Sequence, residues 1–165
     1  MKALIACAVL LLVGPELAAQ TAPEAAPGSQ SRAQGYTFVG LTSSVGDATN
    51  LIALGGGGEG FIYKGLAAGG EVGYLFTGER FAYGLGMASA NVSYHFRELD
   101  PNGRWIPFVT GGYTLAFRGD TGNLANYGGG VTYWFRPRWG ARIEVRNLQY
   151  AHGSTVMFRF GLSFR

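Results

Sequence analysis

The sequence predicts an all-β fold, an eight-stranded antiparallel transmembrane β-barrel preceded by a signal peptide and a short linker. Apolar residues alternate with small or polar residues in eight segments beyond residue 35, which is the two-residue period of β-strands. These segments are roughly 10–14 residues long, close to the length at which a tilted strand crosses a bilayer. Of the 165 residues, 28 are Gly and only 14% are charged. Such strands suit a narrow tube with a small-residue interior and a lipid-facing exterior.

The composition excludes several other classes of protein. The Gly residues follow no triplet period, and aromatic residues make up 14% of the chain, so collagen and disordered chains are excluded. The formal net charge of +3 is only mildly basic and no Lys/Arg-rich run occurs, so we expect no nucleic-acid partner. The length allows one domain.

The N-terminal part predicts export. Residues 1–19 combine a positively charged start, an apolar run and a small residue at the exit, which is the pattern of a secretory signal peptide. Residues 20–34 are rich in Pro, Ala, Ser and Gln and predict a flexible linker, so the barrel is expected over 35–165. Cys7 is the only cysteine and lies in the signal peptide. We therefore expect a mature chain with neither disulfides nor a cysteine-based metal site.

The first half of the barrel is expected to contain four strands. The third and fourth show the alternation most clearly, because Val72 and Tyr74 oppose Glu71 and Gly73 in the third. The first two are less regular, since four consecutive Gly at 55–58 remove the pattern from the second. The expected strands are 36–45, 51–62, 65–76 and 81–96.

The second half repeats the pattern. It is strongest at the C-terminus, where Phe158, Phe160 and Phe164 alternate with small or charged residues. Phe108 and Trp134 fall on the polar side of their segments, and we expect a β-bulge to explain either. The expected strands are 105–118, 123–135, 139–149 and 155–164, and the turns at 63–64, 100–103 and 136–138 are expected on the periplasmic side.

The two faces of the strands indicate the solvent. The polar face is too poor in charge and too rich in Gly to face water, so we expect it to line the interior; Gly84 is included in that set. The apolar face is then exposed to lipid. The alternative is a soluble, lipocalin-like secreted barrel with an apolar interior. Aromatic residues near the strand ends are expected at the membrane interface: Tyr94, Phe96, Trp105, Tyr133, Phe135, Trp139 and Phe164.

Charged residues on the expected inner face form the main candidate site. They are Glu71, Arg142, Glu144, Arg146 and Arg159, and Glu59 is a further candidate. Burying such charges without partners costs several kcal/mol each, so we expect them to form a carboxylate–guanidinium network. A gated ion path is the alternative, but eight strands leave an interior that side chains just fill.

Three stretches carry a family resemblance: IPFVTGGYT (106–114), NYGGGVTYWFRPRWGARIEVRN (126–147) and FRFGLSF (158–164). They resemble the outer-membrane β-barrel domain family, the porin-like group of small OmpA/OmpX-type barrels. The resemblance implies location in the cell outer membrane, contact with its lipid and lipopolysaccharide, and assembly by the barrel-assembly machinery. Such barrels usually end on an aromatic residue, whereas Phe164 is penultimate here. The resemblance fixes neither an activity nor an oligomeric state.

We expect no catalytic, cofactor or metal site. His152 and Ser154 are similar to the His-x-Ser motif of outer-membrane lipid A deacylases, but the family's continuation is absent and no acid follows Glu144. Ser93 and His95 share a face only because the strand period is two. The expected function is therefore a structural, envelope-integrity barrel. The alternatives are, in order, a surface binding or adhesion barrel, a narrow channel and a lipid-modifying enzyme.

Overall fold

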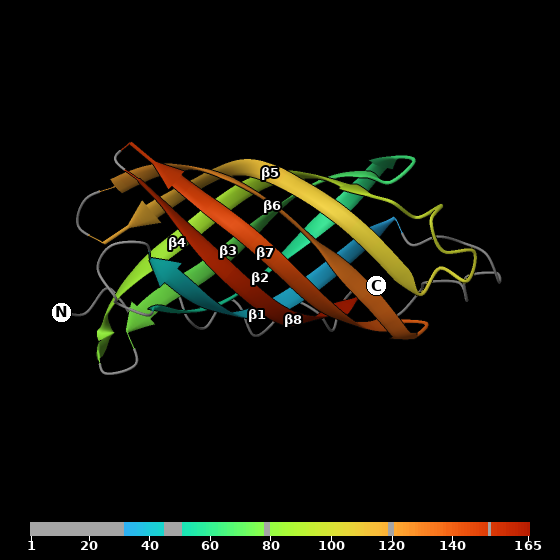
Figure 1. Cartoon of the computed structure of the whole chain (residues 1–165), viewed down its shortest axis with the longest axis horizontal. Helices are drawn as coiled ribbons and strands as arrows, with labels where there is room; N and C mark the ends of the chain where they lie inside the picture. The colour runs from blue at the N-terminus through green and yellow to red at the C-terminus, as the bar shows by residue number, and fades with distance from the viewer. Residues whose placement is uncertain (1–31, 45–50, 78–79, 119–120, 152) are drawn as a thin grey trace, which may run out of the picture. The chain divides into compact units, whose positions relative to one another are not determined.

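The computed structural model describes residues 32–44, 51–77, 80–118, 121–151 and 153–165. The signal peptide expected at 1–19, with Cys7, and linker residues 20–31 lie outside this part of the chain. Eight strands fill the described part (Figure 1): β1 (Ala33–Ser44), β2 (Leu51–Tyr63), β3 (Leu66–Thr77), β4 (Arg80–His95), β5 (Trp105–Phe117), β6 (Thr121–Arg136), β7 (Trp139–Tyr150) and β8 (Gly153–Phe164).

The strands form a closed barrel in which each strand pairs antiparallel with its neighbours in the sequence. β1 pairs with β8 to complete the circle, with Val39 opposite Phe160. Closure gives each strand a partner on both sides over most of its length, so the backbone polar groups in the middle of the wall are paired. The predicted fold class, an eight-stranded antiparallel barrel, is confirmed.

The strand bounds agree with the expected segments to within a few residues, and the largest difference is at the start of β1. Ala33 and Gln34 were expected in the linker but belong to the strand, because Ala33 pairs with Gly60. The buried Gln34 amide also donates a hydrogen bond to Glu59 inside the barrel. A polar, linker-like composition did not reveal this cross-strand contact.

One end of the barrel holds the start of β1, the end of β8 and the connections at 64–65, 96–104 and 137–138 (Figure 1, right). We call it the terminal end, and the opposite one the loop end. The turns expected at the periplasm fall at the terminal end. Lys64 (φ 38°) and Gly65 (φ 89°) both have positive φ, as the favoured two-residue hairpin turn requires.

The outer surface of the barrel is apolar. Val72, Phe160 and Ile143 on three different strands are each more than half exposed, while Arg146, Thr132 and other polar side chains inside are almost fully buried. This is the reverse of a soluble barrel and matches a strand wall surrounded by lipid. The part of the chain that the structure describes has no helix long and apolar enough to cross a membrane.

Three details of the strand faces differ from the sequence expectation. Phe108 and Trp134 keep regular pairing with their neighbours and simply face inward, so no bulge turns them. The register shift in β6 follows Trp134. Gly84 does not line the interior: a Cβ there would meet the ring of Tyr74, which lies on the outward side of β3. The interior therefore contains large aromatic side chains as well as small ones. On the outer surface, Gly84 leaves space for the neighbouring Tyr74 ring.

Candidate functional site

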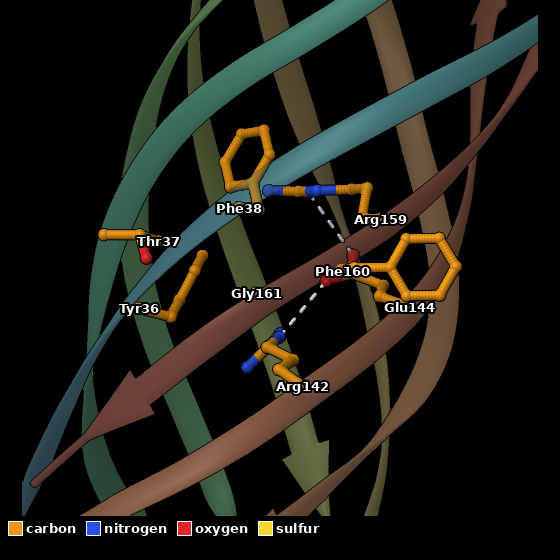
Figure 2. A pocket seen from close by; sticks show the side chains of 8 residues that line it. All are labelled: Tyr36, Thr37, Phe38, Arg142, Glu144, Arg159, Phe160 and Gly161. Carbon is orange, nitrogen blue, oxygen red and sulfur yellow. Dashed lines mark hydrogen bonds and ion pairs between the residues drawn. The ribbon is translucent and has the colours of Figure 1, made fainter.

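The interior of the barrel contains a buried network of charged side chains centred on Glu144 of β7. Three arginines contact its carboxylate. Arg146 Nη2 and Arg142 Nε lie 2.5 and 3.2 Å from its oxygens, and Arg159 Nη1 of β8 lies 3.4 Å away. Figure 2 shows Arg142 and Arg159 pointing at Glu144 from two neighbouring strands. One carboxylate thus joins three guanidinium groups.

Glu71 of β3 completes the network from across the lumen. Its carboxylate receives Arg146 Nη1 at 2.7 Å and Arg159 Nη2 at 3.1 Å. The Tyr36 hydroxyl donates a further hydrogen bond of 3.0 Å. Gly57 makes room for this contact, because a Cβ at position 57 would meet the Tyr36 hydroxyl oxygen at 2.9 Å and the Glu71 Cβ at 2.7 Å. All five residues expected in the network therefore lie in it.

Glu59 of β2 extends the network toward the terminal end. Arg142 Nη1 lies 3.3 Å from its carboxylate and His95 Nε2 lies 3.1 Å from it. Gln34 and Ser93 also donate hydrogen bonds to it. The same arginine therefore links Glu59 to Glu144, and the charges form one continuous group.

The network balances its charges. It holds three carboxylates, Glu59, Glu71 and Glu144, and three arginines, whose side chains are at most 8% exposed. Two of the arginines also lie on aromatic faces, Arg142 at 3.8 Å from the Phe108 centroid and Arg159 at 3.4 Å from that of Phe38. Each of these six groups lies in at least one ion pair, although Arg159 Nε has no hydrogen-bond partner among the described residues. The ion pairs and ring contacts together offset the cost of removing the charges from water.

The arrangement around Ser93 and His95 does not provide an activated nucleophile. A serine is activated when its hydroxyl hydrogen-bonds to a histidine base, which an acid orients. Here the Ser93 hydroxyl donates to Glu59 itself, and the His95 imidazole lies against Phe108 with ring centroids 5.3 Å apart. The other candidate pair is His152 and Ser154, and His152 lies outside the described residues. In the described residues, no three His, Cys, Asp or Glu side chains are grouped so as to hold a metal ion.

A layer of uncharged polar side chains joins β4, β5 and β6. The Asn126 amide donates to Asn91 Oδ1 at 2.9 Å and to Thr114 Oγ1 at 3.0 Å. Thr114 in turn shares a 2.8 Å hydrogen bond with Ser89. These bonds join the three strands without charge, although Asn91 Nδ2 and Asn126 Oδ1 have no hydrogen-bond partner in the part of the chain that the structure describes. Buried side chains thus occupy this part of the lumen.

An apolar layer lies inside the barrel, and most of its members are in the loop-end halves of their strands. Its buried members come from β1, β2, β4, β7 and β8, and Leu75 and Leu124 pack against them. Met157 is 2% exposed and Ala53 is fully buried. Such a layer excludes water and ions, because an ion crossing it would lose its hydration without gaining a partner. The buried members are Tyr36, Phe38, Ala53, Met87, Leu148 and Met157. Tyr36 and Phe38 join this layer to the charge network, because Tyr36 donates to Glu71 and Arg159 lies over the Phe38 ring.

A small pocket lies at the junction of β1, β7 and β8, beside Glu144 (Figure 2). It is too narrow to hold a water molecule, and its lining includes Tyr36, Arg142 and Arg159. Pockets that bind small molecules usually measure about 300–1,000 Å³. The charge network thus fills the space that a ligand would need.

The aromatic residues expected at the interface all lie at the terminal end, and they form pairs there. Trp105 lies 4.4 Å from Tyr133 between ring centroids, Tyr94 lies 5.0 Å from Phe96, and Trp139 lies 6.1 Å from Phe164. Phe135 is also exposed on the outer face. The seven residues therefore mark one belt around the barrel.

A second exposed aromatic group near the loop end was not singled out from the sequence. Phe81 stacks edge-on against Phe76 at 4.8 Å. The strand-end position of these residues is the signal that could have identified them. Two separated belts are typical of a barrel with an interface at each end. The exposed members are Phe81, Tyr83, Tyr113, Phe117, Tyr127 and Tyr150.

The sequence also missed the uncharged partners of the network and the apolar layer. Tyr36 and Phe38 lie on the inner face of β1, whose outer face carries the exposed Val39 and Leu41. Both faces of this strand are therefore apolar, and alternation could not assign them. His95 and Ser93 had the correct face, but their shared partner Glu59 lies about 35 residues earlier in the sequence.

Comparison with known proteins gives fold-level similarity. No family model and no curated protein matches the chain. Among solved structures, the N-terminal β-barrel domain of Pseudomonas aeruginosa OprF superposes with a TM-score of 0.62 at 18% identity, covering 80% of this chain and 95% of that one. The chain has the fold of the small outer-membrane β-barrels.

Two further similar structures show how little this small outer-membrane barrel fold fixes a role. Neisserial surface protein A superposes with a TM-score of 0.56 at 13% identity, covering 80% of this chain and 94% of that one. A de novo designed transmembrane β-barrel superposes with a TM-score of 0.62 at 14% identity, covering 80% and 92%. A natural surface protein and a designed chain share the architecture, so function must be argued from the lumen and the surface.

Proposed function

We propose that this chain is a structural β-barrel of the cell outer membrane that contributes to envelope integrity and keeps its lumen closed. The observation that carries the proposal is the filled interior. The charge network occupies the middle of the lumen, and most of the apolar layer lies toward the loop end. An eight-stranded barrel has an interior just wide enough for side chains, and here they fill it.

The outer surface supports the membrane location. Exposed apolar side chains such as Val72, Val109 and Ile143 lie between the two aromatic belts, at half or more of their full exposure. This surface would aggregate in water, whereas in a bilayer it contacts acyl chains. Outer-membrane lipid and lipopolysaccharide are the partners that this location supplies, and the barrel-assembly machinery is the partner that folding there requires.

The connections at the loop end argue against a surface binding or adhesion role. Residues 45–50, 78–79, 118–120 and 151–152 separate the strands there, so no connection exceeds six residues. A specific protein interface usually uses about 20–30 residues on each side. The loop end alone offers fewer.

Two measurements test the proposal. The folded protein should migrate anomalously on gels unless boiled and should fractionate with the outer membrane; recovery in the soluble periplasm would contradict the location. In planar bilayers the wild type should pass essentially no ions, because the network and the apolar layer block the path. Steady conductance of nanosiemens size would refute the closed lumen and favour the channel. A useful comparison is Glu71→Ala, which removes a carboxylate from the network but leaves Ala53, Met87, Leu148 and Met157 of the apolar layer in place; this variant should also pass no ions.

A further inference from the structure

The terminal end of the barrel is strongly basic. This end contains seven cationic side chains and two acidic ones, Glu98 and Asp100. The cationic residues occur in all three connections, next to the start of β1 and next to the end of β8. At the loop end the connections and the first residue of β4 contain two arginines and three acids. The positive charge is therefore gathered at one end. We call the seven residues the basic rim: Arg32, Lys64, Arg97, Arg104, Arg136, Arg138 and Arg165.

The acids at this end do not neutralise the basic rim. The Asp100 carboxylate accepts hydrogen bonds from the backbone N–H groups of Asn102, Arg104 and Trp105 at 2.8–2.9 Å, so it caps its own turn. In the described part of the chain, the ion pairs all join the side chains of the interior network and its His95 neighbour. Arg104, Arg136 and Arg138 are exposed and belong to none of them.

Two arginines of the rim are held in place by aromatic rings. Arg97 lies 3.6 Å from the Phe61 centroid, and Arg165 lies 4.2 Å from that of Trp134. Arg165 Nε also donates to the Pro137 carbonyl at 2.9 Å. Burial, followed by the nearby positive charge of Arg165, lowers the pKa of Arg97. The Arg97 and Arg165 guanidinium groups thus lie near each other at the rim.

The rim adjoins the belt of exposed aromatics at the same end. Trp105 is 55% exposed and Trp139 is 47% exposed, and each begins a strand directly after a rim connection. Tryptophan rings on an outer barrel surface lie at the level of lipid headgroups. The basic rim therefore reaches the plane of the phosphates next to the barrel.

We propose that the basic rim binds the phosphate groups of anionic phospholipids in the leaflet at the terminal end. Six of its seven members are arginines, whose planar guanidinium groups bind phosphate through paired hydrogen bonds. Basic residues next to a bilayer attract anionic headgroups within a Debye length of the surface. The inference rests on the barrel spanning a membrane, as proposed above.

The three Trp residues, at positions 105, 134 and 139, all lie at the terminal end, so their fluorescence reports on this rim. We would insert the protein into phosphatidylcholine vesicles and measure Trp quenching by brominated phosphatidylglycerol and by brominated phosphatidylcholine. At low salt, Trp quenching of the wild type by brominated phosphatidylglycerol should exceed quenching by brominated phosphatidylcholine about fivefold or more. The combined variant Arg104→Gln, Arg136→Gln and Arg138→Gln should lose most of this preference, while the loop-end control Arg118→Gln should keep it.

The outcomes separate the two proposals. A chain that fails to insert contradicts the membrane-spanning barrel, and with it the lipid site. A chain that inserts without a preference for phosphatidylglycerol, or whose preference survives the triple substitution, overturns the rim alone. For the wild type, raising the salt to about 1 M should abolish the preference. Inorganic phosphate and chloride are compared at equal ionic strength. If phosphate reduces the quenching by brominated phosphatidylglycerol more than chloride does, the rim binds a soluble anion instead.

Discussion

The middle of the lumen and its loop-end layer fill the same narrow tube in two different ways. The middle uses three carboxylates and three arginines that contact one another across β2, β3, β7 and β8. The loop-end layer uses methionine, leucine and aromatic side chains. The charged region requires a partner for each group, since an unpaired buried charge is costly. The apolar region requires only volume, so it should tolerate substitution far better.

The largest effect is expected at the centre of the charged region. Glu144→Gln keeps the side-chain shape but removes the negative charge that faces Arg142, Arg146 and Arg159. Breaking a buried ion pair from one side costs about 3–5 kcal/mol. We expect a loss of that size in the free energy of unfolding, measured by urea titration with Trp fluorescence in lipid vesicles. A loss below about 1 kcal/mol would mean that the network adds little to stability.

The second prediction introduces a charge at the next residue of the same strand, where the side chain lies on the outer face. Val145 follows Glu144 and is 43% exposed on the outer face. Val145→Arg would place a guanidinium in lipid without a carboxylate, at a cost of about 2–4 kcal/mol near the middle of the bilayer. Gln149→Arg, on the same face but near the loop end of β7, should cost about 0–1 kcal/mol. Equal losses of unfolding free energy in both variants would contradict the assigned faces or depth.

A smaller effect is expected in the apolar layer. Met157→Leu conserves volume at a site that is 2% exposed. Such swaps usually cost less than about 1.5 kcal/mol in unfolding free energy. The same urea titration compares it directly with Glu144→Gln. If the conservative swap were the more damaging of the two, close packing rather than charge pairing would be the stricter requirement in this lumen.

The smallest effect lies outside both regions, in the turn at 96–104. Hydrogen bonds from the backbone N–H of Trp105, and then of Asn102, lower the pKa of the exposed Asp100 carboxyl. A group with a lowered folded-state pKa stabilises the fold above its ordinary pKa of about 3.9, and this contribution is lost as the pH falls through the folded value. Asp100→Asn should therefore reduce the decline in stability between about pH 5 and pH 2.

The control for this pH dependence is Glu98→Gln, in the same exposed turn. It removes an acid for which the structure gives no comparable set of backbone donors. Its stability curve between pH 5 and pH 2 should follow that of the wild type. If Asp100→Asn also follows the wild type, the turn contributes nothing to the acid sensitivity of the barrel.

Much of the fold and part of the site could be predicted from local pattern. The alternation placed Glu71, Glu144 and Arg159 on the inner face, and their burial demanded partners. It could not identify Glu59 as the common partner of Ser93 and His95, because that contact joins residues far apart in the sequence. It also misread Phe108 and Trp134, since alternation assumes an interior of one chemical character.

By itself, the sequence determined the number of strands, their faces and the sign of the charges inside. These follow from a two-residue period that each strand carries alone. Only the tertiary structure decided which charges meet, where the apolar layer lies, and that the cationic residues outside gather at one end. These features depend on the closing of the barrel and on the register offset between neighbouring strands, which together set how far along the barrel axis each residue lies. Side chains such as Glu71 and Arg159 meet across the lumen only once the circle is complete.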